Sequence, residues 1–425
     1  MHKSVTLIPI FDTYAQFTQN TERQYEMDRP FLTKYLDSFN SQFDARSDYE
    51  AVRRFLKSNS RVQTTYNNYR TQVERLLLWA WLKQGKPVLG LLRSDMEEFM
   101  GFCCSPDPSW IGKAIKSRYI TEQGCLVPNP SWRPFTMRTS KASSKVAKEE
   151  LRDVPAPTFK MSSGSIGQVY AAINSFFHYC ISEQLIGANP CALIGKNKSK
   201  WTGRDLVLAK PKALTKLQWE FVIETAELMA EEKPKKGERT LFAIVMMFSC
   251  YLRVSDLVGN GTWRPTMGSF QKSNSGWWYH VVGKGNVQDK IAVKPDCIHY
   301  LKRYRKHLGL PEYPAAGDSD PLLSTAHGRA GMTDRQLRKD VQAVLDRTVL
   351  KMQEEGFPEE DVSNLRSTSL HWFRHTGATF DAPYRSPKNL QADMRHKSLA
   401  TTQNIYYSTL DDERAAEVEG LTIRR

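Results

Sequence analysis

The sequence predicts a mainly α-helical protein that carries a small β-hairpin in its second half. Apolar residues recur at spacings of three and four over several long segments, which is the pattern of helices with one buried face. One segment, 275–293, differs, because aromatic and β-branched residues lie on both sides of a Gly-Lys-Gly-Asn turn, as is typical of a hairpin. The length of 425 residues is typical of two domains, or of three.

Three helices are predicted in the first half of the chain. Segment 60–85 repeats apolar residues along one helical face, and segment 163–187 does the same until Pro190 ends the pattern. Segment 94–104 is shorter, and we expect its helix to begin after Ser94 as the N-cap, with a glutamate three residues later.

Composition divides the chain into regions. Residues 105–160 are rich in Pro, Ser, Lys and Arg, which is typical of a loop or an insertion. Residues 195–215 are basic and nearly free of apolar periodicity, which is compatible with an ordinary solvated linker and with a tether that lies over DNA phosphates. We expect an N-terminal extension (1–50), a helical domain (51–195) with a basic insertion (about 105–160), a basic linker (196–214), a second domain (215–410) and a C-terminal tail (411–425).

The charge of the chain favours a polyanionic partner. Lysine and arginine number 60 against 46 aspartates and glutamates, which gives a formal net charge of +14. Nucleic acid and an acidic membrane surface would both attract such a protein. The longest apolar run, 241–252, is too short for a bilayer and predicts a buried helix, and the basic amphipathic helix that a membrane surface requires is missing. Nucleic acid is therefore the favoured partner, and no membrane is expected.

Cysteine and histidine spacing indicates neither disulfides nor a metal site. Seven cysteines without Cys-x-x-Cys spacing predict reduced thiols and a cytoplasmic protein, and the N-terminus does not have the pattern of a signal peptide. The histidines and cysteines also lack the spacing of metal ligands, so neither a metal nor another cofactor is expected.

Four short stretches carry residues suited to phosphoryl transfer. "CYLRVSDL" contains Arg253, the hairpin turn contains Lys284, "LHWFRHTGATF" contains His371 and Arg374, and "MRHKSLATTQNIYYST" contains a histidine followed by two tyrosines. Each stretch alone has a simpler explanation: an ion pair between neighbouring residues, a pair of side chains on a helix surface, or an ordinary turn. Their combination and order are the informative feature.

Taken in this order, the motifs resemble those of the tyrosine recombinase (phage integrase) family. The resemblance covers roughly residues 207–410 in its motifs, and segment 55–195 looks more loosely like the helical core-binding domain of that family. It implies a helical core-binding domain and an α+β catalytic domain that form a clamp around DNA. The resemblance also implies a site-specific recombinase or integrase that cleaves and rejoins DNA strands without metal or ATP.

The chemistry of these residue types fits that role. Two guanidiniums, those of Arg253 and Arg374, can hold the non-bridging oxygens of a phosphodiester while negative charge builds on them. His371 and His396 can donate hydrogen bonds or move protons. The resemblance implies that Lys284 protonates the leaving 5′-oxygen.

The nucleophile is one of two neighbouring tyrosines. The resemblance implies that a tyrosine hydroxyl forms a covalent 3′-phosphotyrosyl link, and in this family that tyrosine lies nine or ten residues after the second histidine. Tyr406 is ten residues after His396, Tyr407 is eleven, and successive helical residues point about 100° apart, so only one of them fits the site. We expect Tyr406 to be the nucleophile and Tyr407 to pack or to contact DNA.

Two positions depart from the usual motifs of the family. Arg395 stands where most members have Gly before the histidine, and it could change the approach of His396 or contact a phosphate. Asp256, which is expected to orient the site, stands where a Glu is usual.

The resemblance also implies the partners. We expect double-stranded DNA with specific recombination sites, a dimer on each site and a tetramer in synapsis, in the cytoplasm and associated with the nucleoid; the tail 411–425 either docks on a neighbouring protomer or packs in cis. Accessory directionality proteins cannot be named from the sequence. A type IB topoisomerase-like or telomere-resolving enzyme, or a catalytically inactive DNA-binding relative, is the alternative, although all six expected catalytic positions are filled.

Overall fold

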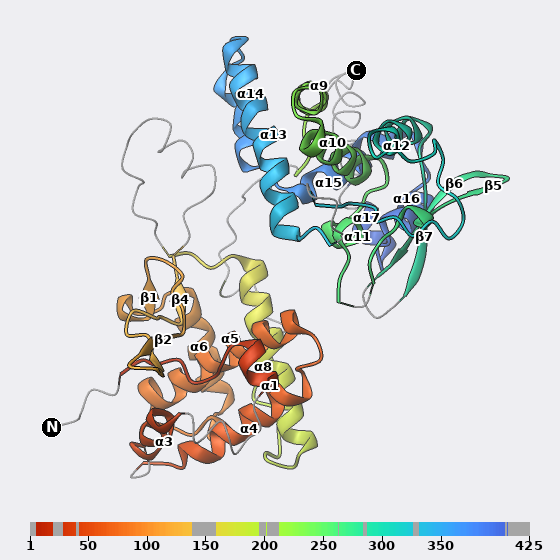
Figure 1. Cartoon of the computed structure of the whole chain (residues 1–425). Coiled ribbons are helices and arrows are strands. Elements are labelled where there is room, and N and C mark those ends of the chain that lie inside the picture. Colours follow the sequence, from red (N-terminus) through yellow and green to blue (C-terminus); the bar gives the residue numbers. More distant parts are fainter. Residues whose placement is uncertain are drawn as a thin grey trace, which may run out of the picture. The chain divides into compact units, whose positions relative to one another are not determined.

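The computed structural model describes residues 6–19, 29–39, 42–137, 159–194, 201, 212–261, 263–283, 287–325, 331–403 and 406 (Figure 1). The chain divides into two compact units. Unit 1 comprises Met1–Thr139 and Asp153–Val207, and unit 2 comprises Ser140–Arg152 and Leu208–Arg425. Each unit has an apolar core of its own.

Unit 1 is mainly helical. The predicted helices in segments 60–85, 94–104 and 163–187 are confirmed. The expected N-cap at Ser94 is wrong, because the helix starts at Arg93 and the carboxylate of Asp95 accepts a hydrogen bond from the Leu92 amide at 2.8 Å. The described helices of unit 1 are α1 (Tyr14–Gln19), α3 (Pro30–Asp37), α4 (Ala45–Ser58), α5 (Gln63–Trp79), α6 (Arg93–Cys104) and α8 (Ser163–Ser182), with short helical turns at Ala80–Gln84, Val88–Gly90 and Pro108–Trp110.

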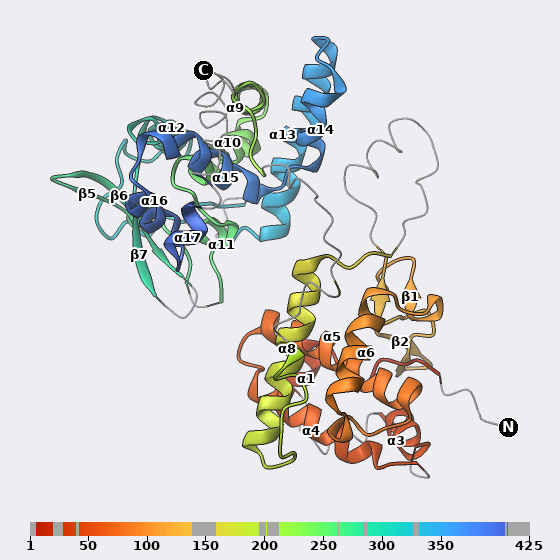
Figure 2. The same ribbon diagram turned by 180° about the vertical axis from the view of Figure 1, so that it is seen from behind.

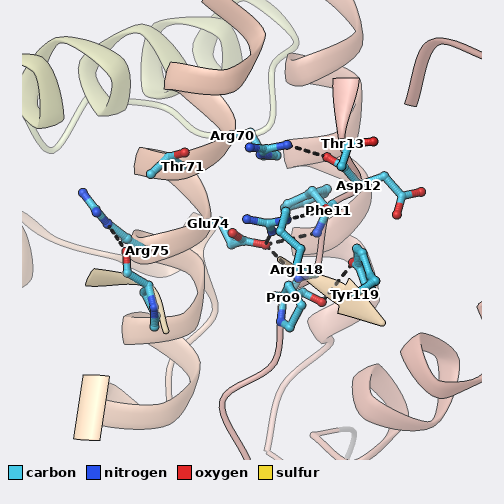
Figure 3. Close-up of polar contacts among 12 residues, drawn as sticks. Pro9, Phe11, Asp12, Thr13, Arg70, Thr71, Glu74, Arg75, Arg118 and Tyr119 are labelled. Atoms are coloured by element: carbon cyan, nitrogen blue, oxygen red, sulfur yellow. Dashed lines mark hydrogen bonds and ion pairs between the residues drawn. The ribbon is translucent and has the colours of Figure 1, made fainter. Parts of the chain in front are cut away.

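Residues 6–19 lie in the expected N-terminal extension, yet they pack into the core of unit 1. Ile10 and Phe11 are fully buried, and their amides donate to one carboxylate oxygen of Glu74 on α5 at 2.7 and 3.1 Å (Figure 3). Arg118 also donates to this carboxylate, and its Nε donates to the carbonyl of Phe11 at 2.8 Å. A buried carboxylate is costly without such donors, so Glu74 fixes this segment against the helix.

Part of the expected insertion at 105–160 is also built into unit 1. Its described residues form two pairs of short strands, and three of its aromatic side chains, Trp110, Trp132 and Phe135, are buried in the core. A loop was expected there because of its composition, and this correction reflects the aromatic residues that anchor it. The strands are β1 (Ile111–Gly112), which pairs in parallel with β4 (Phe135–Thr136), and β2 (Tyr119–Glu122), which pairs antiparallel with β3 (Cys125–Pro128).

Unit 2 is organised around one buried helix, α10 (Pro234–Ser249), as the apolar run at 241–252 predicts. Figure 1 shows this helix among α9, α12 and α15. No helix in the described part of the chain is long and apolar enough to cross a membrane. The other described helices of unit 2 are α9 (Lys216–Glu232), α11 (Val254–Val258), α12 (Pro295–His307), α13 (Asp334–Glu354), α14 (Glu359–Ser367), α15 (Leu370–Asp381), α16 (Pro387–Met394) and α17 (Leu399–Thr402), with short turns at Met267–Ser269 and Ala382–Tyr384.

A three-stranded antiparallel sheet flanks these helices. The predicted hairpin at 275–293 is confirmed as β6 (Gly276–Val282) and β7 (Gln288–Ala292). A further strand, β5 (Phe270–Ser273), pairs with β6 and was not expected from the sequence. The mainly α-helical fold with a small sheet in the second unit is therefore confirmed.

Gly377 brings α15 against the end of α10. A Cβ atom at this position would lie 2.0 Å from the carbonyl oxygen of Phe248, so no other residue fits without moving one helix. Because Arg374 lies one turn earlier on α15, this close approach carries its guanidinium to the residues that follow α10. The glycine in "RHTGATF" thus positions the arginine of the same motif.

Candidate active site

Unit 2 brings the start of α11, the helix α15, the end of α16 and Tyr406 to one place, and α11, α15, α16 and α17 lie near one another in Figures 1 and 2. Five of the six expected catalytic residues lie there: Arg253, His371, Arg374, His396 and Tyr406. The sixth, Lys284, and the second tyrosine of the pair, Tyr407, lie outside the described residues.

Arg374 is the buried centre of the site. Its side chain is 1% exposed, and its two terminal nitrogens donate to the backbone carbonyls of Tyr251 and Met394. Burial, together with the positive charges of Arg253 and Arg395, lowers the pKa of Arg374 to about 9, so the guanidinium stays charged at neutral pH. Its Nε is buried and has no hydrogen-bond partner among the described residues. The two carbonyls therefore fix the guanidinium and leave its Nε–H without a partner in the described part of the chain.

Asp256 links the arginine before α11 to the arginine after α16. Its buried carboxylate accepts the backbone N–H of Arg253 at 2.7 Å, and both terminal nitrogens of Arg395 donate to it. The backbone carbonyl of Asp256 accepts from the hydroxyl of Tyr279 on β6 at 3.0 Å. Asp256 therefore holds the backbone of Arg253, with Arg395 as its ionic partner.

The backbone of Arg395 explains the glycine that is usual at this position. Arg395 follows α16 with φ of 52° and ψ of 44°, in the left-handed region that favours glycine. An arginine costs about 1–2 kcal/mol of backbone strain there. The side chain turns to Asp256, so the structure brings the two departures from the family pattern into contact.

Tyr406 lies inside the site on the same chain. Its side chain is 1% exposed, and its hydroxyl is 2.6 Å from Nδ1 of His375 on α15. Burial raises the pKa of Tyr406, against the opposing effect of Arg374 and Arg253, so the phenol is protonated in this state. Its ring belongs to a small apolar cluster with Tyr251, Ala378, Ala382, Leu390 and Met394.

Histidine rings surround this tyrosine. The ring of His396 lies parallel to that of Tyr406, with centroids 6.2 Å apart, and His371 meets His375 edge to face at 4.4 Å. Nδ1 of His396 forms a hydrogen bond of 3.0 Å with the hydroxyl of the buried Thr402. Thr402 therefore fixes the orientation of the His396 ring.

Sequence reasoning missed His375 and Thr402. His375 is four residues after His371, so a helical reading of "HWFRHTG" places both rings on one face, and that spacing could have revealed it. Thr402 has no comparable signal, because its role depends on the turn between α16 and α17.

The half-buried histidines His375 and His396 make stability sensitive to acid. Burial, followed by the positive charge of neighbouring groups, lowers the pKa of His375 to about 3 and that of His396 to about 4, from an ordinary value of 6.5. Below pH 6.5 the unfolded chain binds protons that the folded chain rejects, so we expect the free energy of unfolding to fall between pH 6.5 and 4. Each histidine contributes at most about 1.4 kcal/mol per pH unit, reduced by solvent screening of the partly exposed rings.

Urea unfolding at several pH values measures this slope. His375→Gln should flatten it, whereas the matched change His299→Gln at an exposed position on α12 should not. A wild-type stability that rises on acidification through this range would contradict the assignment.

No metal site is formed by the described residues, in which no group of three or more His, Cys, Asp or Glu side chains is suitably placed. What the site offers an anion is a set of cations and neutral imidazoles around a buried phenol. Such a site can stabilise negative charge on a phosphodiester and supply an oxygen nucleophile to it.

Known proteins share this sequence pattern and fold. No family model matches the chain. It is 27% identical over 239 residues to tyrosine recombinase XerC of Myxococcus xanthus, which covers 55% of this chain and 68% of the relative. It is 23% identical over 303 residues to tyrosine recombinase XerC of Chlamydia pneumoniae, which covers 67% of this chain and 82% of the relative.

A solved structure agrees over nearly the full length. The crystal structure of XerH site-specific recombinase, in a post-cleavage complex with a palindromic difH substrate, superposes with a TM-score of 0.54 at 15% identity. The match covers 96% of this chain and 93% of that one, and it shows the shared fold. In its sequence relatives, its fold and the order of its motifs, the chain resembles the tyrosine recombinases.

Proposed function

We propose that this protein is a site-specific DNA recombinase that uses Tyr406 as its nucleophile. The phenolic oxygen attacks a DNA phosphodiester, a 3′-phosphotyrosyl link forms, and a 5′-hydroxyl leaves; the reverse reaction with another 5′-hydroxyl rejoins the strands. The observation that carries this proposal is the position of Tyr406, which lies buried against His375 and in the field of Arg253 and Arg374 of its own chain. This arrangement favours cleavage in cis.

The arginines bind the reacting phosphate in this proposal. Arg374 is held by two backbone carbonyls and retains an Nε that has no partner in the described part of the chain, so an oxygen of the phosphate would satisfy it. Arg253, at the exposed start of α11, supplies the second guanidinium. Preorganised donors of this kind stabilise the charge that develops in the transition state.

The remaining expected residues complete the reaction. His371 and His396 donate hydrogen bonds to the phosphate, and Asp256 and Thr402 position their neighbours. Lys284 lies in the sequence between β6 and β7, and we assign to it the protonation of the leaving 5′-oxygen. No ATP takes part in this scheme, because the ester with Tyr406 retains the energy of the broken bond, and the cationic side chains supply the charge stabilisation that a metal would otherwise give.

Double-stranded DNA is the proposed partner. The net charge of +14 and the DNA complex of the XerH recombinase support this assignment. We propose that unit 1 serves as the core-binding domain and unit 2 as the catalytic domain; the boundary between Val207 and Leu208 falls within the expected basic linker 196–214. A dimer on each site, a tetramer in synapsis and a cytoplasmic location remain predictions, and the tail 411–425 lies outside the described residues.

Covalent adduct formation tests this function. The protein is incubated, with a metal chelator present, with a pool of nicked duplexes of randomised sequence, and adducts that resist denaturation are collected. We expect adducts with the wild-type protein and with Tyr407→Phe, and none with Tyr406→Phe, because only the latter lacks the attacking oxygen. Tyr406→Phe that still forms the adduct would refute the nucleophile, and a wild-type protein that forms none would refute the enzyme.

A further inference from the structure

We propose that His375 accepts the phenolic proton of Tyr406 during strand cleavage and returns it during rejoining. This inference rests on the proposed function, in which Tyr406 is the nucleophile, and it adds a catalytic residue to the set predicted from the sequence motifs.

The geometry of the pair is suited to proton transfer. Nδ1 of His375 lies 2.6 Å from the hydroxyl oxygen of Tyr406, which is within hydrogen-bond reach of the proton that must leave. The tyrosine side chain is 1% exposed, so bulk water has little access to that proton. In His396 the corresponding nitrogen, Nδ1, is already used in the bond to Thr402.

The position of the imidazole is fixed by its helix. His375 lies on α15 next to Arg374, whose guanidinium is anchored to two carbonyls, and the ring of His371 packs edge to face on it. The contact of Gly377 with α10 holds this part of the helix in place. A phosphate bound by Arg374 would therefore lie beside a phenol whose direction His375 has already set.

The charges around His375 keep it in the form that accepts a proton. His371 and Arg374 face it from its own helix, and His396, Lys212 and Tyr406 face it from other segments. Burial and the positive neighbours hold the imidazole neutral at neutral pH, so a lone pair on Nδ1 can accept the phenolic proton. An arriving phosphodiester brings negative charge next to these cations, which makes His375 more basic when the proton must move.

Each step balances. In cleavage the O–H bond of Tyr406 breaks, its electron pair forms the O–P bond, the proton moves to His375, and the 5′-oxygen leaves with a proton from the group we assign to Lys284. In rejoining the 5′-hydroxyl attacks the phosphorus, its own proton returns to Lys284, and the phenolate recovers its proton from His375. No oxidant, reductant or additional reactant is needed.

His375→Asn separates proton transfer from positioning. The asparagine oxygen can accept the same hydrogen bond, but it cannot take up the proton. We expect single-turnover adduct formation on nicked DNA to fall by about 10²–10⁴-fold at neutral pH and to rise with pH in the variant more steeply than in the wild type. His375→Gln provides a second variant if the first does not fold.

A more acidic nucleophile provides the matched control. Difluorotyrosine at position 406 loses its proton more readily, so it should restore much of the rate lost in His375→Asn. The same replacement should not restore the rate lost in His371→Asn, because His371 is assigned to the phosphate rather than to the phenol.

The outcomes distinguish this inference from the function on which it rests. Wild-type adduct together with a wild-type rate and pH profile in His375→Asn would overturn the role of His375 alone. A loss of rate that difluorotyrosine does not restore would also overturn it, because the defect would then be one of position. Absence of adduct with the wild-type protein would overturn the proposed function, and with it this inference.

Discussion

Replacing Arg374 by lysine is expected to slow DNA strand cleavage by at least about 10²–10³-fold, the usual effect of removing one preorganised donor from a developing oxyanion. Lysine keeps the charge but lacks the planar fork that reaches the carbonyls of Tyr251 and Met394 and also a phosphate. The buried carbonyls would lose their donor, at a cost of about 1–3 kcal/mol for each group left unsatisfied. Single-turnover adduct formation measures the first effect and urea unfolding the second.

An exposed arginine provides the control for this change. Arg347 on α13 pairs with Glu232 on α9 at the surface, with both side chains about half exposed, so Arg347→Lys should leave both quantities nearly unchanged. If Arg374→Lys cleaved DNA at the wild-type rate, the geometry of the guanidinium would not matter, and the role assigned to Arg374 would be wrong.

Separating Arg395 from Asp256 is expected to have the second large effect. The two side chains are 6% and 4% exposed. Replacing either residue leaves the other as a buried charge without its partner, which typically lowers the free energy of unfolding by about 3–5 kcal/mol. Arg395→Gly removes the backbone strain at a φ of 52° and still destabilises the protein, because Asp256 is left unpaired. Asp256→Asn is expected to be similarly harmful, because Arg395 then lacks its counter-charge.

The double variant tests whether this coupling is real. Asp256→Asn combined with Arg395→Gly removes both charges and the strained backbone, so its free energy of unfolding should exceed that expected from the sum of the single changes. Urea unfolding of the four proteins in the cycle gives the coupling energy. If the changes in the free energy of unfolding of the two single variants simply added, the ion pair would contribute nothing to the stability of the protein.

The sequence predicted what depends on periodicity and on residue order. The buried helix α10, the hairpin of β6 and β7 and the helix that carries His371 and Arg374 all follow from local patterns. The motifs also named five candidate residues that the fold brings together in unit 2. Local spacing was informative there because neighbouring residues of one helix or strand form each feature.

Contacts between distant segments could not be predicted in this way. Glu74 binds the backbone amides of Ile10 and Phe11, and backbone groups have no residue-specific signal in a sequence. The sequence showed that Arg395 replaces the usual glycine, but it left open whether this arginine changes the approach of His396 or contacts a phosphate. Its ion pair with Asp256 is visible only in the fold. A single sequence gives no sign that Asp256 and Arg395, which are 139 positions apart, form an ion pair.

Mapping the DNA-linked residue tests the central claim most directly. The adduct of the wild-type protein is trapped on nicked DNA, digested with nuclease and protease, and analysed by mass spectrometry to locate the nucleotide on the peptide. We predict that the nucleotide is attached to Tyr406 through a phosphodiester. A nucleotide on Tyr407 or on any other residue would contradict the account.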